Sequence, residues 1–139
     1  MHPLTYPAKV VEAQPNDFVV QFIDIPEAIS GGATVDEALA EAAEALEVAV
    51  EYYLNEGRAI PDPSPVRGGQ HDVALAPAIA ARLLLIRTMT EQKLSKVALA
   101  ARMGRDEKVV RRVLSGKGAS LDLTLAALKA IGVRPALAV

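Results

Sequence analysis

One proline- and glycine-rich segment limits how this chain can fold, because it can form neither a helix nor a central strand. Residues 60–69 contain three prolines within five positions, Pro61, Pro63 and Pro65, followed by a pair of glycines. Proline lacks the backbone N–H that both structures need, and paired glycines favour turns. The segment is therefore a linker or an extended edge segment, and it divides the chain into two parts.

The two parts differ strongly in charge, although the chain of 139 residues carries a formal charge of only −2. Residues 1–72 hold three Lys or Arg against thirteen Asp or Glu, a net −10, whereas residues 73–139 hold twelve against four, a net +8. A basic part of this strength is typical of proteins that bind nucleic acid. We therefore expect two domains, at residues 1–70 and 73–139, with different partners.

The composition excludes several classes of site. The chain has no cysteine, so it can form no disulfide, no thiolate zinc site and no thiol nucleophile. The histidines His2 and His71 lie far apart in the sequence without a third partner, which favours ordinary polar positions over a metal site. The chain starts without a signal peptide pattern, and no run reaches the ~18 apolar residues of a membrane span. We expect a cytoplasmic protein without a cofactor, a metal or a membrane partner.

The apolar pattern of the first part predicts three strands and a long helix. Alternating apolar residues indicate strands at residues 4–11 and 18–22, and a short third strand around Ile29. The apolar period then changes to that of a helix, which begins at Val35 with a Thr-x-x-Glu capping box and ends near Glu56. The outer face of this helix is acidic and carries Asp36, Glu37, Glu41, Glu44, Glu47 and Glu51. Such a face is either a solvated surface or a docking surface for a cationic partner.

The second part predicts helices, after room for one short strand at residues 73–76. Pro77 can open the first helix, because its missing N–H costs nothing at the first helical position. Glycines then separate three shorter helices, which we expect at residues 95–103, 106–114 and 121–131.

Two of these short helices have the spacing of a helix-turn-helix. Ser95 and Asp106 can cap them, and Gly104 permits the left-handed backbone that ends the first one. Basic residues on the outer side of the second helix would then reach bases or phosphates of DNA. The residues that we expect to contact DNA are Lys96, Arg105, Glu107, Lys108, Val109, Arg111, Arg112 and Lys117. The alternative is a small helical bundle with a cationic surface.

Residues 78–133 resemble the Cro/repressor-like helix-turn-helix family. Over nearly its whole length, the chain resembles the HicB antitoxins, on three motifs in order: Phe22-Ile23-Asp24-Ile25-Pro26, Thr34-Val35-Asp36-Glu37-Ala38-Leu39, and the prolines of residues 60–69. This resemblance implies an α+β protein, with a β-β-β-α-β domain that is a truncated, inactive RNase H-like unit and an all-α helix-turn-helix domain. It further implies that the first domain covers a HicA-like toxin that cuts mRNA, and that a helix-turn-helix dimer represses the operon at an operator of double-stranded DNA.

The resemblance places the toxin contacts on the acidic first domain, whose charge complements that of a basic ribonuclease. The residues that we expect to contact the toxin are Asp24, Ile25, Pro26, Glu27, Glu41 and Glu44. A metal-dependent nuclease would need several converging carboxylates. We do not expect an enzyme, because the strand at residues 4–11 contains no acidic residue.

Two alternatives concern the partner and the assembly. A stand-alone transcription regulator, whose first domain senses a small molecule, would share the same DNA-binding half. The tail at residues 134–139 is either a frayed end or a short strand that pairs with its symmetry mate and closes a homodimer.

Overall fold

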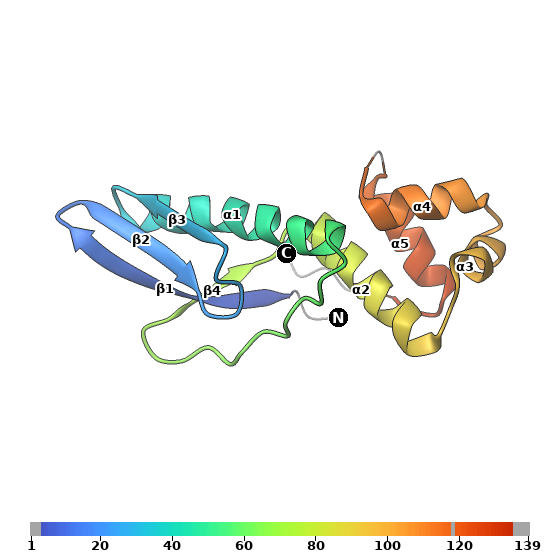
Figure 1. Ribbon diagram of the computed structural model, residues 1–139, viewed down its shortest axis with the longest axis horizontal. Helices are drawn as coiled ribbons and strands as arrows, with labels where there is room; N and C mark the ends of the chain where they lie inside the picture. Colours follow the sequence, from blue (N-terminus) through green and yellow to red (C-terminus); the bar gives the residue numbers. More distant parts are fainter. Residues whose placement is uncertain (1–3, 118, 135–139) are drawn as a thin grey trace. The chain divides into compact units, whose positions relative to one another are not determined.

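The computed structural model describes residues 4–117 and 119–134, which divide into two compact units, Leu4–Ala76 and residues 77–134 (Figure 1). The first unit contains a sheet and one helix, and the second contains helices. The fold class is therefore α+β, as predicted. Within the described residues, no helix is both long and apolar enough to cross a membrane.

The sheet of the first unit has four antiparallel strands in the order β3-β2-β1-β4. The strands are β1 (Thr5–Gln14), β2 (Asp17–Phe22), β3 (Ile29–Gly32) and β4 (His71–Ala74). Asn16, in left-handed backbone with φ of 59°, forms the turn between β1 and β2. The strands predicted at residues 4–11 and 18–22 are confirmed and pair with each other, and the predicted short third strand is also confirmed.

Helix α1 (Val35–Asn55) runs along the sheet (Figure 1). It begins where predicted, because the Thr34 hydroxyl accepts a hydrogen bond from the Glu37 N–H at 3.1 Å, while the Glu37 carboxylate accepts one from the Ala33 N–H at 3.1 Å. Gly57, with φ of +67°, follows its end. The residues that α1 buries are Ala38, Ala42, Leu46, Ala49, Val50 and Tyr53.

The proline-rich segment at residues 60–69 has no regular structure and is fastened to the first unit. The Tyr6 hydroxyl donates to the Pro61 carbonyl at 2.9 Å. The Ser64 N–H and hydroxyl donate to the two oxygens of Asp24 at 2.8 and 2.5 Å. This part of the chain is therefore an anchored extended segment rather than a free linker.

Strand β4 belongs to the first unit, although residues 73–76 were predicted to be part of the second domain. It pairs with the first residues of β1, in a register that places Val73 opposite Tyr6. Val73 and Leu75 are buried. The first unit therefore extends to Ala76, because its sheet needs this last strand.

The second unit packs four helices around one core. They are α2 (Pro77–Gln92), α3 (Lys96–Met103), α4 (Glu107–Ser115) and α5 (Leu121–Ala130), close to the predicted bounds. The buried residues of this core are Ala81, Leu85, Met89, Leu99, Ala100, Val110, Val113, Ala127, Leu128 and Ile131. Apart from Arg134, the predicted strand at residues 134–139 lies outside the described residues, as does His2.

Candidate functional site

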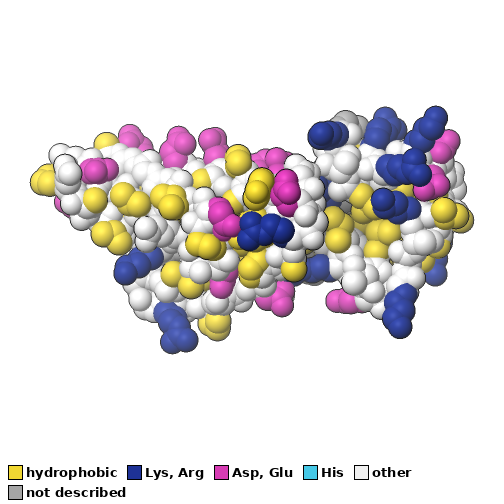
Figure 2. Space-filling model, in the orientation of Figure 1, with side chains coloured by type: hydrophobic (Ala, Val, Ile, Leu, Met, Phe, Trp, Pro, Cys, Tyr) yellow, Lys and Arg dark blue, Asp and Glu magenta, His cyan; other side chains and the backbone are white. Residues whose placement is uncertain are grey.

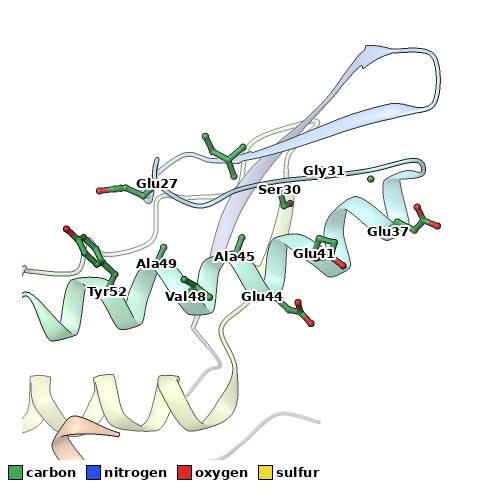
Figure 3. A pocket seen from close by; sticks show the side chains of 12 residues that line it. Glu27, Ser30, Gly31, Glu37, Glu41, Glu44, Ala45, Val48, Ala49 and Tyr52 are labelled. Carbon is green, nitrogen blue, oxygen red and sulfur yellow. The ribbon is translucent and has the colours of Figure 1, made fainter. Parts of the chain in front are cut away.

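A groove of about 1220 Å³ lies between the edge strand β3 and the flank of α1 (Figure 3). On the strand side it is lined by Glu27 and by residues 29–32. The helix side supplies Glu37, Glu41, Glu44, Ala45, Val48, Ala49 and Tyr52. In Figure 3, Ala45 and Ala49 point toward the strand, whereas the carboxylates of Glu37 and Glu44 point away from it. The groove therefore has a small apolar floor and an acidic rim.

The groove gathers exposed apolar side chains beside carboxylates. Ile29, Val48 and Tyr52 are 57%, 67% and 51% exposed, and all three line the same groove. None of the described residues that line the groove is a lysine or an arginine. An apolar patch with a rim of one sign of charge suits a protein partner that is both apolar and cationic.

Two glycines set the width of the groove at one end. A Cβ on Gly32 would lie 2.7 Å from the Ala38 nitrogen, and one on Gly31 would lie 3.0 Å from the Phe18 carbonyl oxygen. The Ser30 hydroxyl donates to the Ala38 carbonyl at 3.0 Å. Strand β3 can approach the first turns of α1 this closely because Gly32 has no side chain, whereas Gly31 allows the close approach of β3 to the Phe18 carbonyl of β2.

At the other end of the groove, Glu27 is held by two residues near the end of α1. The Tyr53 hydroxyl donates to Glu27 at 2.5 Å, and the Arg58 guanidinium forms an ion pair with it at 3.1 Å. The guanidinium also lies 4.0 Å from the centroid of the Tyr53 ring. The hydrogen bond from Tyr53 is the main reason that the pKa of Glu27 is lowered, and it raises the pKa of Tyr53. Glu27 therefore stays ionised in a fixed position.

The predicted toxin-contacting residues separate into two groups. Glu27, Glu41 and Glu44 line the groove, and Pro26 is exposed beside it in the sequence. Ile25 is fully buried, so its side chain supports the unit from within. Asp24 accepts both hydrogen bonds from the proline-rich segment, which gives its carboxylate a structural role.

The apolar side of the groove was not predicted from the sequence. Ala45, Val48 and Tyr52 follow Glu41 at intervals of four, three and four residues, which is the spacing of one helix face. From this spacing, a second apolar face on α1, beside the buried one, could have been predicted. The position of Ile29 in the groove could not be predicted from the sequence, because it depends on which strand lies at the edge of the sheet.

In the second unit, α3 and α4 are joined by a tight turn. The Ser95 hydroxyl accepts from the Ala98 N–H and the Asp106 carboxylate from the Lys108 N–H, each at 3.0 Å. Gly104 ends α3 with φ of +65°. The predicted caps and the predicted turn are confirmed.

The predicted DNA-contacting residues all lie around this helix pair. Those that are exposed are Lys96, Arg105, Lys108, Arg111, Arg112 and Lys117, whereas Glu107 and Val109 are half-buried. Val110 and Val113 are fully buried on the opposite side of α4. Lys and Arg side chains gather on this unit, and Asp and Glu side chains gather along α1 of the other (Figure 2). An ion pair of 2.9 Å between Glu107 and Arg111 was not predicted.

A buried arginine fastens the end of α4. Arg82 is 6% exposed, and its guanidinium donates to the Ser115 carbonyl at 3.1 Å. The next residue, Gly116, has φ of +74°, and a Cβ there would lie 1.8 Å from the Arg82 guanidinium. A cation at this position stabilises the negative end of the helix dipole. The role of Arg82 was not predicted, although a charged residue inside the apolar run of α2 is the sequence feature that indicates it.

The described residues contain no group of three His, Cys, Asp or Glu that could hold a metal ion. The groove offers carboxylates and apolar atoms, and the helix pair offers cations.

Comparison with known proteins agrees with this arrangement. Residues 5–83 match the family described as HicB-like antitoxins of bacterial toxin–antitoxin systems. The chain is 31% identical to antitoxin HicB of Escherichia coli K12 over 130 residues, which covers 93% of this chain and 94% of the relative. It is 37% identical to antitoxin HicB 2 of Photorhabdus laumondii over 130 residues, covering 93% and 91%. The chain therefore belongs to the HicB-like antitoxin family of bacterial toxin–antitoxin systems.

Proposed function

We propose that this protein neutralises a HicA-like, mRNA-cleaving toxin through its first unit and represses its own operon through its second unit, in the cytoplasm. The observation that carries the toxin half is the groove between β3 and α1, with its apolar floor and four carboxylates. The order of elements in the first unit, three strands, a helix and a last strand, suits a truncated, inactive RNase H-like unit.

Electrostatics supports a basic toxin as the occupant of the groove. A ribonuclease that binds mRNA needs a cationic surface for the phosphates. Glu41 and Glu44 offer it exposed carboxylates on one flank of α1, a helix that contains no basic residue. Opposite charge on two surfaces speeds their encounter and disfavours wrong partners.

Co-expression with the product of the neighbouring gene tests the toxin half. The wild-type chain should co-purify with that product and restore growth. The double variant Glu41→Lys/Glu44→Lys should lose both properties, because it reverses the charge of the rim. Glu51→Lys is the matched control, since Glu51 is also exposed on α1 but does not line the groove. Full rescue by the double variant would exclude the groove, and DNA binding without any protein partner would favour a stand-alone regulator.

The repressor half of the proposal rests on the geometry of α3 and α4. We infer that they form a helix-turn-helix in which α4 enters the major groove, with Lys108, Arg111 and Arg112 on its exposed side. Lys96 lines a hollow of about 360 Å³ with Lys93 and the cap Ser95, a suitable place for a backbone phosphate. A homodimer would place two such helices ~34–36 Å apart, to meet a palindromic operator.

A gel-shift titration at fixed salt tests the repressor half. Arg111→Ala/Arg112→Ala should abolish specific binding to the promoter DNA of the operon, because each good base contact contributes ~1–3 kcal/mol. Lys129→Ala is the control for a lost exposed charge on a different helix, and it should retain specific binding. Unchanged affinity of the double variant would remove α4 from the DNA interface.

A further inference from the structure

We propose that the partner contributes an extended, cationic segment that adds as a fifth strand to the edge strand β3, with its side chains against α1. This inference deepens the proposed function and rests on it. In this mode of binding, the groove holds the partner by backbone pairing along residues 29–32, in addition to contacts with the carboxylates of α1.

Strand β3 is an edge strand with little protection against pairing. Within the described residues it pairs with β2 alone. Its sequence, Ile-Ser-Gly-Gly, contains no charged residue and no proline. Natural edge strands are commonly protected by lysine, proline, a bulge or shortness, and β3 has only its length of four residues. An edge of this kind is suited to receive a strand from another chain.

The wall of the groove at Gly31 and Gly32 is backbone. Both residues line the groove and have no side chain, so backbone is exposed there. Because adjacent residues of an antiparallel strand direct their N–H and C=O groups to alternate sides, one of the two glycines offers these groups to the open edge. The short distances from a Cβ at either position, 2.7 Å at Gly32 and 3.0 Å at Gly31, explain why side chains are absent. An approaching chain can therefore reach the backbone of β3 without first displacing side chains.

The flank of α1 runs beside this strand and fixes the chemistry of the added segment (Figure 3). From Glu41 to Tyr52 the helix rises by about 16 Å, which an extended chain of about five residues covers. Side chains of an extended chain alternate between two sides. On the side that faces α1, apolar side chains would meet Ala45 and Val48, and longer lysine or arginine side chains would reach Glu41 and Glu44.

The charges favour a cationic partner over a second copy of this chain. Pairing of β3 with its own symmetry mate would bring two acidic flanks together, each with exposed Glu41 and Glu44. Like charges at such an interface are unfavourable. Glu37 also lines the groove on the helix side and extends the same negative charge, whereas Glu27 on the strand side is paired with Arg58.

The test uses the ¹⁵N-labelled full-length chain and three synthetic peptides of about seven residues. In the first, lysine and valine take turns at every second position, with threonine between them, so that both face the same side. The second has the same sequence with alternate backbone nitrogens methylated, which removes pairing and keeps the charge. The third replaces lysine by glutamate. We expect the first peptide to slow hydrogen exchange about tenfold or more for amides among residues 29–32. The other two should leave that exchange unchanged.

Charge-reversal variants and the methylated peptide complete the test of strand addition. Glu44→Lys should weaken binding of the first peptide at least several-fold, whereas Glu51→Lys should not. Equal binding of the methylated and unmethylated peptides, or binding without protection of residues 29–32, would overturn strand addition. Because these measurements use no toxin, the failure of toxin binding in co-expression is a separate result.

Discussion

In the second unit, every candidate DNA-contacting residue lies within residues 96–117, whereas the groove of the first unit joins residues 27–32 to a helix flank that extends to Tyr52. The first arrangement depends on local caps and one tight turn. The second depends on which strand lies at the edge of a sheet and on how closely a helix packs against it. Single substitutions can change the exposed residues of the helix pair without affecting the fold. In the groove, some of the lining residues also hold the strand and the helix together.

Charge is used differently in the two units as well. In the first unit, Asp24 and Glu27 are engaged by hydrogen bonds from other parts of the chain. In the second unit, the cations of α4 are exposed, and Arg111 is paired with Glu107 one helical turn away. An exposed pair of this kind contributes only ~0.3–0.5 kcal/mol. The acidic unit therefore uses part of its charge for folding, whereas the cations of α4 remain at the surface.

The largest expected effect comes from separating the units. Residues 1–76 should fold and neutralise the toxin without binding DNA, and residues 77–139 should bind DNA without neutralising the toxin. A fragment of residues 1–70 should fail to fold, because it lacks β4 and the buried Val73 and Leu75. Circular dichroism and growth assays measure these outcomes. A folded, active fragment 1–70 would contradict the role of β4.

A second prediction compares two glycines that end neighbouring helices. Both Gly104 and Gly116 have positive φ, at +65° and +74°. Gly104→Ala should cost about 1 kcal/mol, the usual penalty for left-handed backbone. Gly116→Ala should cost about 3 kcal/mol or more, because its Cβ would displace the buried guanidinium of Arg82. Urea unfolding measures both, and equal costs would show that Arg82 can move without penalty.

The sequence predicts most of the local structure and less of the groove. The Thr34 cap, Gly104 and the spacing of Val110 and Val113 act within a few residues, so their effects can be read directly. The roles of Ile25 and Asp24 cannot be read in this way. One residue enters the core and the other fastens a segment 40 positions later, and both outcomes depend on tertiary packing.

A smaller effect is expected from releasing the proline-rich segment. Asp24→Ala removes both hydrogen bonds that hold Ser64, and hydrogen bonds to a charged acceptor contribute ~1.5–3 kcal/mol. We expect the unfolding free energy of the first unit to fall by about 2 kcal/mol and residues 60–69 to become sensitive to protease. Asp17→Ala, at an exposed position in β2, is the control and should change little. A stable Asp24→Ala variant would mean that the segment is held elsewhere.

The smallest expected effect is a pH dependence from Glu27. The pKa of Glu27 in the folded chain lies below its ordinary value of 4.5, chiefly because Tyr53 donates a hydrogen bond to it. The resulting stabilisation is present above pH 4.5 and is lost as the pH falls through the lowered folded pKa. Glu27→Gln should therefore lower the melting temperature of the chain at pH 7, and the difference from wild type should shrink below pH 4.5. Tyr53→Phe removes the main cause of the shift and should reduce the same difference. A gap between wild type and Glu27→Gln that stays constant from neutral to acidic pH would show that the contribution of Glu27 is steric, and that the acidic unit does not use this charge for folding.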